Sequence, residues 1–333
     1  MNAMYVINAR NVNDAYKQGY ELIVSMGEFR ESRGGQVLVL GRPLVTCYRH
    51  PRERVLLDPG RNANPFFHLI ESLWMLAGMD DAARLSRYVG DFGDRYAEED
   101  GNIHDAYGRR WRSAFGFDQI KEVVRRLRAD PNDRQCVLQM WDCDTGREND
   151  LLGSWRTRPC NTHAYFSWQR GALDLTLCCR SNDMVWGAYG ANVVQFTMLL
   201  EYVAGMTGLA VGTFYQISNN FHVYRDLLVK LQAPGKTRAY PGSEPIGDEW
   251  SDWDEDLAVF WSTEDDPEGF APYRNRWFAN VAEPVRRAHW YFKRRELASC
   301  TEELERIGAP DWRLACTEWV TRRLAVVPVG GDW

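Results

Sequence analysis

The chain has 333 residues, of which 45% are hydrophobic and 26% are charged, and its formal net charge is −6 at pH 7. These are ordinary values for a globular protein, and the length suffices for one large domain or two smaller ones. The negative net charge argues against DNA as a partner, so any phosphate group has to be bound by local arginines.

No basic segment followed by an apolar one opens the sequence, which predicts a protein without a secretion signal. The stretch with the fewest charges, residues 184–224, contains five glycines and many polar residues, so it predicts a buried core segment and not a membrane span. The eight cysteines form neither a dense disulfide pattern nor a CxxC zinc pair. We therefore expect reduced thiols, no metal site and a cytoplasmic protein without membrane contact.

Residues 66–78 (FFHLIESLWMLAG) predict a helix that ends at a glycine. Helical spacing places Glu71 on the same face as Phe67, Trp74 and Met75. A carboxyl group on an apolar face loses hydration, so we expect a raised pKa and proton exchange near neutral pH. The alternative is a structural glutamate that is held by a buried partner.

Residues 162–180 predict a β-hairpin, because two alternating segments flank a turn-like sequence near residue 170. The numbers of facing residues then sum to about 340, which places Cys160 opposite Arg180 with Cβ atoms roughly 5 Å apart. A guanidinium at that distance favours a thiolate, which is nucleophilic. The alternative is that Cys160, like Cys178 and Cys179, only fills space in the core.

Residues 193–203 predict a helix that is buried on most sides, and NNFHVY (219–224) follows it. Asn192, His222 and Tyr224 are hydrogen-bonding side chains in this nearly uncharged part of the chain. Buried amides and imidazoles need partners, and a ligand is one candidate partner. For His222 the commoner case is a core histidine with a protein partner.

We expect a single catalytic domain over residues 1–333, with a core at 1–232 and an extension at 233–333. Prolines and glycines mark residues 233–247 as a loop. The acidic stretch 248–268 is interpreted as a solvated insertion, and the last 60 residues predict helices.

Together these segments resemble the thymidylate synthase family, which includes the nucleotide 5-hydroxymethylases of phages and of nucleoside-antibiotic pathways. The resemblance spans roughly residues 20–228 and depends on the order and spacing of LIESLWMLAG, YGRRW, RPCN, CRSND, GAYGAN and NNFHVY. It implies an α+β fold with a mixed sheet, and a homodimer packed sheet against sheet. It also implies a pyrimidine nucleoside monophosphate as substrate and 5,10-methylenetetrahydrofolate as co-substrate.

The resemblance also implies the catalytic roles. Cys160 matches the nucleophile, and Glu71 and Tyr107 match the proton-transfer network. Asp183 matches the acid that meets the folate pterin, and Glu71 and Trp74 belong to the same folate site.

Four residues match the binding site of the substrate phosphate. Arg180, which also supports catalysis at the cysteine, and Ser181 come from CRSND, and Arg33 lies in a Ser-Arg-Gly-Gly loop. Arg134 matches the arginine that reaches this phosphate from the neighbouring subunit. The family usually has a second arginine there, where this chain has Gln135.

Base and sugar recognition is implied for Asn192, which matches the reader of the pyrimidine edge, and for His222 and Tyr224, which match the ribose-binding residues. Asn161 joins the substrate site in place of the usual histidine after the cysteine. An amide can flip to suit uracil or cytosine. The altered surroundings favour dCMP or CMP over dUMP, and Ser181 favours the deoxyribose form.

The implied chemistry begins with addition of Cys160 to C6 of the base, which makes C5 nucleophilic enough to take the methylene of the folate. Loss of tetrahydrofolate leaves an exocyclic methylene. Hydride from the folate then gives a methyl group, whereas water gives a hydroxymethyl group.

Two departures from the family pattern favour hydroxymethylation. The tryptophan that shields the exocyclic methylene in synthases falls on Gly93, beside Phe92, and a missing ring would leave room for water. The sequence ends in AVVPVGGDW, which does not match the apolar tail that covers the folate in synthases.

Three alternatives remain open at the level of sequence. A thymidylate synthase would methylate dUMP. A nucleotide- or RNA-binding relative would lack turnover, although it would not need Cys160. A cysteine hydrolase would need a nearby base, and His163 lies three residues along the strand and is expected to face away.

Overall fold

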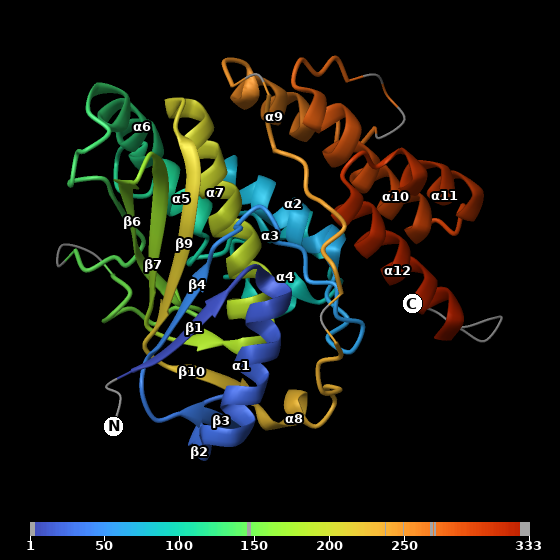
Figure 1. Ribbon diagram of the computed structural model, residues 1–333. Coiled ribbons are helices and arrows are strands. Elements are labelled where there is room, and N and C mark those ends of the chain that lie inside the picture. The colour runs from blue at the N-terminus through green and yellow to red at the C-terminus, as the bar shows by residue number, and fades with distance from the viewer. Residues whose placement is uncertain are drawn as a thin grey trace.

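The computed structural model describes residues 4–144, 148–236, 238–248, 250–266, 269 and 271–326 (Figure 1). It has a mixed α+β fold with two sheets. The six-stranded sheet has the order β1 (Tyr5–Ala9), β4 (Leu44–Tyr48), β9 (Ala210–Ser218), β7 (Ala172–Cys179), β6 (Asn161–Gln169) and β5 (Val137–Gln139). The four-stranded sheet has the order β2 (Gly27–Ser32), β3 (Gly35–Leu40), β10 (Phe221–Tyr224) and β8 (Asn182–Asp183).

Helices cover one face of the larger sheet, and further helices form the C-terminal extension (Figure 1). Those of the core are α1 (Val12–Met26), α2 (Pro65–Leu76), α3 (Ala82–Ser86), α4 (Phe92–Tyr96), α5 (Tyr107–Arg112), α6 (Gln119–Ala129), the wide-turned segment η1 (Met184–Ala191), α7 (Asn192–Thr207) and α8 (Arg225–Leu228). Those of the extension are α9 (Trp253–Ser262), the wide-turned segment η2 (Phe278–Ala282), α10 (Glu283–Lys293), α11 (Leu297–Arg306) and α12 (Pro310–Val326).

Helix α2 confirms the prediction for residues 66–78. The side chain of Asn64 caps its first turn by accepting a hydrogen bond from the N–H of Phe67, and Pro65 occupies the first helical position. Gly78 follows the helix at a φ of 76°, the left-handed conformation that glycine adopts without a Cβ clash. Glu71 is buried within this helix, which fixes the direction of its carboxyl group.

The β6–β7 hairpin also forms as predicted. Its two-residue turn has Arg170 at a φ of 54° and Gly171 at a φ of 86°, and the ladder runs down to the pair Asn161–Cys179. One step further, the N–H of Arg180 donates to the carbonyl oxygen of Cys160 at 2.8 Å. The predicted register is confirmed, and it brings the cysteine to the end of the hairpin.

Helix α7 lies behind the larger sheet and is buried through most of its length, as expected. Glu201 is the acidic residue within it and is fully buried. Arg54 and Arg52 form ion pairs with the two oxygens of its carboxylate. A buried charge needs such partners, and here they join α7 to the segment before α2.

The acidic stretch 248–268 differs from the prediction of a solvated insertion. Helix α9 buries Trp253, Leu257 and Phe260, which lie along one face of the helix. Asp256 is buried as well, because its carboxylate accepts hydrogen bonds from the backbone N–H groups of Arg274 and Asn275. The high acid content hid an amphipathic helix whose aromatic face packs on the protein.

Helices α10 and α12 pack against α2, so the extension is part of the same structure as the core (Figure 1). The C-terminal sequence AVVPVGGDW, which differs from the apolar tail of synthases, lies outside the described residues apart from its first two. None of the helices in the described part of the chain has the length and apolar character that a bilayer crossing requires.

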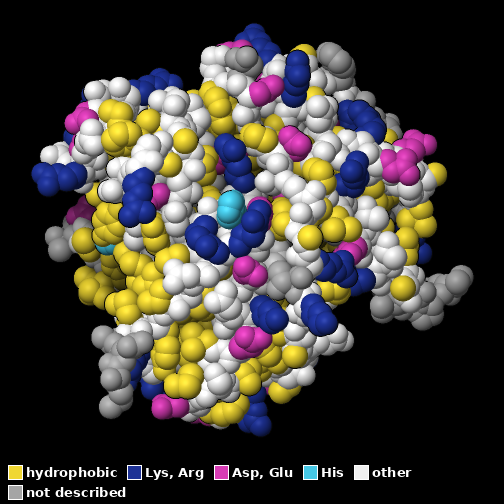
Figure 2. Space-filling view, viewed as in Figure 1, with side chains coloured by type: hydrophobic (Ala, Val, Ile, Leu, Met, Phe, Trp, Pro, Cys, Tyr) yellow, Lys and Arg dark blue, Asp and Glu magenta, His cyan; other side chains and the backbone are white. Residues whose placement is uncertain are grey.

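The face of the larger sheet that lies away from the helices carries apolar side chains, and Figure 2 shows such side chains gathered over the strands. Val6 and Tyr165 are 55% and 41% exposed. Val45 pairs with Ile217, and both are half-buried on strands at the centre of the sheet. This open face has the character of a surface that another protein could cover.

Candidate active site

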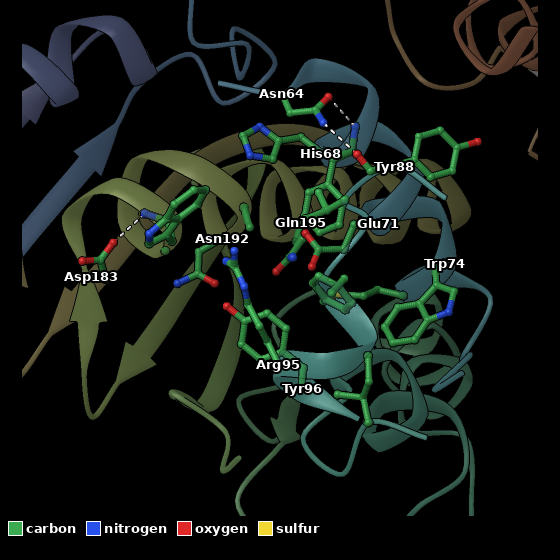
Figure 3. Close-up of a pocket in the computed structure, with 18 of the residues that line it drawn as sticks. Asn64, His68, Glu71, Trp74, Tyr88, Arg95, Tyr96, Asp183, Asn192 and Gln195 are labelled. Atoms are coloured by element: carbon green, nitrogen blue, oxygen red, sulfur yellow. Dashed lines mark hydrogen bonds between the residues drawn. The ribbon is translucent and has the colours of Figure 1, made fainter. Parts of the chain in front are cut away.

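A cavity of about 990 Å³ lies between α2, α5, the end of the β6–β7 hairpin, η1 and the extension (Figure 3). Its volume is at the upper end of the range of about 300–1,000 Å³ for small-molecule sites. The predicted site residues that line it are Glu71, Trp74, Tyr107, Cys160, Ser181, Asp183 and Asn192. The fold therefore brings together side chains from five separate parts of the sequence.

Tyr107 holds the loop that carries Cys160. Its hydroxyl oxygen accepts hydrogen bonds from the backbone N–H of Cys160 at 3.1 Å and of Asn161 at 3.2 Å. Because the oxygen accepts both bonds, its own proton remains available for a ligand in the cavity. Burial raises the pKa of Tyr107 well above its ordinary value, so the phenol stays protonated.

Arg180 lies beside the cysteine, but the electrostatic result differs from the prediction. Burial raises the pKa of the Cys160 thiol, and Asp105 and Asp183 raise it too, while Arg180 lowers it. Arg180 thus acts in the expected direction, but loss of hydration outweighs one guanidinium, so the pKa of the thiol lies above its ordinary value. The guanidinium itself donates to the carbonyl oxygens of Pro159 at 2.8 Å and Arg158 at 2.9 Å, which fixes the loop before the cysteine.

Glu71 has the raised pKa that its place on an apolar helix face predicted. Burial raises its pKa to about 8, the nearby Asp105 adds to the rise, and a hydrogen bond with Gln195 opposes it. Its Oε2 atom is buried without a hydrogen-bond partner in the described structure. In Figure 3 the carboxyl group of Glu71 and the amide of Gln195 lie next to each other in the cavity wall.

Three buried amides form a chain at the base of the cavity. Asn161 Nδ2 donates to Asn192 Oδ1 at 3.0 Å, and Asn192 Nδ2 donates to Asn182 Oδ1 at 3.0 Å. Asn182 Nδ2 in turn donates to Ser218 Oγ at 2.9 Å. Asn192 Nδ2 also donates to Asn161 Oδ1 at 3.5 Å, so both amide hydrogens of Asn192 have protein partners and one lone pair of its Oδ1 atom is left for a ligand.

Asp183 caps η1 and faces the cavity. Its Oδ1 atom accepts hydrogen bonds from the N–H of Val185 at 2.9 Å and of Trp186 at 2.6 Å, and one of these bonds is drawn in Figure 3. Its Oδ2 atom is buried and has no partner in the described structure, and burial raises the pKa of the carboxyl group. An oxygen in this position is ready to accept a hydrogen bond from a ligand.

Six predicted residues do not line this cavity, and two of them, Asn161 and Arg180, lie next to Cys160 as described above. Arg33 is exposed in the turn between β2 and β3, and Arg134 is exposed before β5. His222 and Tyr224 lie on β10, where His222 pairs with Asp183 of β8. Burial raises the pKa of Tyr224, the nearby Asp183 and Cys160 add to the rise and Arg33 opposes it, so Tyr224 lies at the edge of the site.

Gly93 is not the gap in the cavity wall that the sequence predicted. A Cβ atom at this position would point to Ser86 Oγ, 3.2 Å away on α3, and Gly93 does not line the cavity. The wall is formed instead by Phe92, Arg95 and Tyr96. The prediction of an opening left by a missing ring is therefore wrong, because α4 turns this position away from the site.

A family model for thymidylate synthase matches residues 15–242, which is more than half of the chain. The chain belongs to the thymidylate synthase family. This assignment agrees with the site, since the shared segments are the ones that contribute the cysteine, the buried glutamate and the amide chain. Members of this family transfer one carbon from 5,10-methylenetetrahydrofolate to a pyrimidine nucleotide, and the chain is a one-carbon transferase of this kind.

Relatives within the thymidylate synthase family include phage and bacterial proteins. The chain is 39% identical to a deoxyuridylate hydroxymethyltransferase of Pseudomonas phage M6, over 97% of this chain and 95% of that protein. It is 35% identical to the protein of the same name from Bacillus phage SP01, over 67% of this chain and 60% of that protein. It is 32% identical to the thymidylate synthase of Symbiobacterium thermophilum, over 53% of this chain and 65% of that protein.

Sequence reasoning missed several residues of this thymidylate synthase-like cavity. Gln195 reaches Glu71 from α7, one helical turn after Asn192, and this spacing was a signal that could have identified it. Arg95 and Tyr96 belong to the short helix α4, for which no helix was predicted. The extension contributes a further group, which is His289, Phe292, Lys293, Arg295, Trp319 and Arg323. Within the described residues, no group of three or more His, Cys, Asp or Glu side chains could hold a metal ion.

Proposed function

We propose that this enzyme converts deoxyuridylate to 5-hydroxymethyldeoxyuridylate, with the carbon supplied by 5,10-methylenetetrahydrofolate and the oxygen by water. The observation that carries the proposal is the convergence of Cys160, Tyr107, Glu71 and Asn192 on one cavity. The name of the two phage relatives supports the choice of deoxyuridylate and of hydroxymethyl transfer. Family membership alone would leave both choices open.

The reaction begins with Cys160, whose sulfur adds to C6 of the uracil once its proton has left. The electron pair of the C5–C6 double bond moves to C5, which attacks the methylene carbon of the folate. Loss of the C5 proton and departure of tetrahydrofolate leave an exocyclic methylene on the ring. Water adds to this carbon and the sulfur leaves C6, so nothing is oxidised or reduced overall.

Glu71 is the proton carrier in this sequence. A carboxyl group with a pKa of about 8 is populated in both protonation states near neutral pH, so it can donate a proton in one step and accept one in another. Gln195 orients it through their hydrogen bond. The phenol of Tyr107 donates its free proton within the same cavity.

The product choice is supported by polar side chains next to Glu71. Arg95 and Tyr96 extend into the space between Asn192 and Glu71 (Figure 3). Burial raises the pKa of Tyr96, and Glu71 and Asp105 lie close enough to add to the rise. Hydroxyl, guanidinium and carboxyl groups can hold a water molecule where an apolar wall would exclude it.

The base choice is not decided by Asn192 alone. The free lone pair of its Oδ1 atom can accept a hydrogen bond from N3–H of uracil, and an amide flip would present a donor to N3 of cytosine instead. The altered surroundings that favoured dCMP or CMP form the amide chain with Asn161 and Asn182, which is compatible with either base. The names of the phage relatives therefore support our choice of deoxyuridylate.

We infer that the enzyme acts as a homodimer through the open face of the larger sheet. Val45, Ile217 and Tyr165 lie on strands of this sheet with part of their apolar surface uncovered. Arg134 is exposed and does not line the cavity of its own chain. Both features fit an arginine that reaches the phosphate of the partner subunit's substrate.

The test is the mass of the product formed from deoxyuridylate, dCMP or CMP with methylenetetrahydrofolate. We expect only deoxyuridylate to react rapidly, with a mass increase equal to CH₂O. Cys160→Ala should abolish turnover, and Cys143→Ala should leave it unchanged because Cys143 is exposed outside the cavity.

Other products would contradict the proposal in different ways. An increase equal to CH₂ with formation of dihydrofolate would identify a thymidylate synthase. A product from dCMP and not from deoxyuridylate would support the cytosine nucleotide that the sequence favoured as substrate. Nucleotide binding without any product or exchange of the C5 hydrogen would favour a binding protein.

A further inference from the structure

The extension supplies one wall of the catalytic cavity, although the family model ends at residue 242. Phe292 and Lys293 come from the last turn of α10, and Trp319 and Arg323 come from α12. Both helices pack on α2, the helix that carries Glu71. The relation to the Pseudomonas phage M6 protein covers 97% of the chain and so includes most of this extension.

The two parts of the cavity wall differ in charge, because the core contributes acidic side chains as well as Arg61 and Arg95, whereas the charged side chains of the extension are all basic. The acidic residues that line the cavity, Glu71, Asp105 and Asp183, all belong to the core. Among the described residues that the extension contributes, Lys293, Arg295 and Arg323 are basic and none is acidic. The extension therefore presents positive charge to whatever occupies its end of the cavity.

The extension also contributes aromatic rings to the cavity wall. Phe292 and Trp319 are 7% and 5% exposed, with ring centroids 5.4 Å apart. His289 stacks on Tyr88 at 4.5 Å, and burial lowers the pKa of His289 to about 3, so it contributes a neutral ring. The guanidinium of Arg323 lies 3.4 Å from the ring centre of Trp319, which keeps the cation against the aromatic wall.

The chemical groups of the folate co-substrate follow an order that matches the two ends of the cavity. Its pterin carries the one-carbon unit and must lie against the nucleotide at Cys160. An aminobenzoyl ring follows, and a glutamate with two carboxylates forms the opposite end. With the pterin in the core, ring and carboxylates extend toward an end of the cavity that offers aromatic faces and cations.

We propose that the extension is the binding site for the aminobenzoyl-glutamate end of the folate. Phe292 and Trp319 pack against the benzoyl ring, and Lys293 and Arg323 pair with the glutamate carboxylates. The inference rests on the folate co-substrate of the proposed function, but it holds whether the product carries a hydroxymethyl or a methyl group. In this way a segment outside the family match completes the folate site.

Equilibrium binding to the full-length protein tests the proposal without turnover. Calorimetric titrations at saturating deoxyuridylate would compare tetrahydrofolate with tetrahydropteroate, which lacks the glutamate. We expect Lys293→Gln and Arg323→Gln each to weaken tetrahydrofolate binding about three- to tenfold, as for partly exposed ion pairs. Both variants should bind tetrahydropteroate as the wild type does. Added salt should weaken tetrahydrofolate binding more than tetrahydropteroate binding.

The matched control is Arg294→Gln, which removes a cation next to Lys293 that stacks on Trp290 and does not line the cavity. It should bind both ligands as the wild type does. Arg323 packs on Trp319, so if Arg323→Gln fails to fold, Lys293→Gln carries the test, because Lys293 is exposed.

Two results would overturn the proposal. Unchanged tetrahydrofolate affinity in Lys293→Gln would remove the carboxylate pairing, and an equal loss for tetrahydropteroate would show an effect on shape and not on charge. A wild-type protein that binds neither ligand would overturn the proposed function together with this inference. A methylated product would overturn only the hydroxymethyl assignment.

Discussion

At the scale of single residues, the site depends on groups whose ionisation burial has changed. Glu71 has a pKa raised to about 8, and burial also raises the pKa of the Cys160 thiol. Both groups are therefore mostly protonated at neutral pH before substrate binds. In the proposed reaction, the proton that leaves the thiol and the proton that Glu71 holds are then available for transfer. Arg180 lowers the pKa of the thiol and so favours the thiolate.

Replacement of Glu71 by Gln should change how stability depends on pH. The carboxyl pKa rises from 4.5 to about 8 on folding, so between these values the folded state binds more protons than the unfolded state. In the wild type this group therefore lowers the free energy of unfolding as pH rises, by up to about 1.4 kcal/mol per unit. Urea denaturation from pH 5 to pH 8 should show the variant gaining stability relative to the wild type.

The same Glu71→Gln variant should lose at least about a hundredfold in kcat, because general acid–base catalysis contributes that much or more. Its affinity for deoxyuridylate should change little, since the nucleotide is held by other groups. A parallel pH dependence of stability in both proteins would contradict the raised pKa, whatever the activity of the variant.

At the scale of elements, the extension shows how an acidic sequence can form a buried helix. The acids at the start of α9 lie in its first turn, where the partial positive charge of the helix terminus favours them. Trp253 is fully buried, donates from Nε1 to the carbonyl oxygen of Ile246 at 2.9 Å and contacts the ring of Phe278. The helix is therefore held by its aromatic face and not by its charges.

Trp253→Ala should lower the free energy of unfolding by about 3–5 kcal/mol, because it leaves a cavity and an unpaired carbonyl group. Chemical denaturation followed by circular dichroism measures this loss. Trp290→Ala is the matched control, since Trp290 is half-buried under Arg294 and should cost clearly less. Equal losses of unfolding free energy in the two variants would support the interpretation of residues 248–268 as a solvated insertion.

At the scale of the whole molecule, the open face of the larger sheet and the position of Arg134 connect assembly with activity. A single chain has Arg134 exposed and away from its own cavity. In a two-fold dimer each subunit contributes the same face, so each arginine can serve the site of the other subunit. Under the proposed dimer, activity requires two copies of the chain.

Mixing two inactive variants should restore activity if this assembly is correct. Cys160→Ala keeps Arg134, and Arg134→Ala keeps Cys160, so a mixed dimer contains one complete site. After joint refolding of equal amounts, about a quarter of wild-type activity is expected from random pairing. Unmixed samples of either variant are the controls. A monomer by sedimentation, or no recovery with mixed dimers present, would contradict the shared site.

The sequence alone was enough to predict the elements that carry the chemistry. The helix of Glu71, the register that places Cys160 next to Arg180, and the buried helix after Asn192 follow from spacing and turn residues, which are local properties. The family match was visible for the same reason, because its blocks are short and contiguous. The raised pKa of Glu71 was predictable from the apolar face of one helix.

Only the tertiary structure decided which distant groups share the cavity. The pKa of Cys160 depends on burial by several segments and on Asp105, which no local pattern reports. The orientation of Gly93 depends on how α4 packs on α3, and the role of the extension depends on α10 and α12 meeting α2. Local pattern fixes helix faces and strand registers, but hydration and charge around a buried group are sums over all neighbours in space, and these neighbours exist only once the chain has folded.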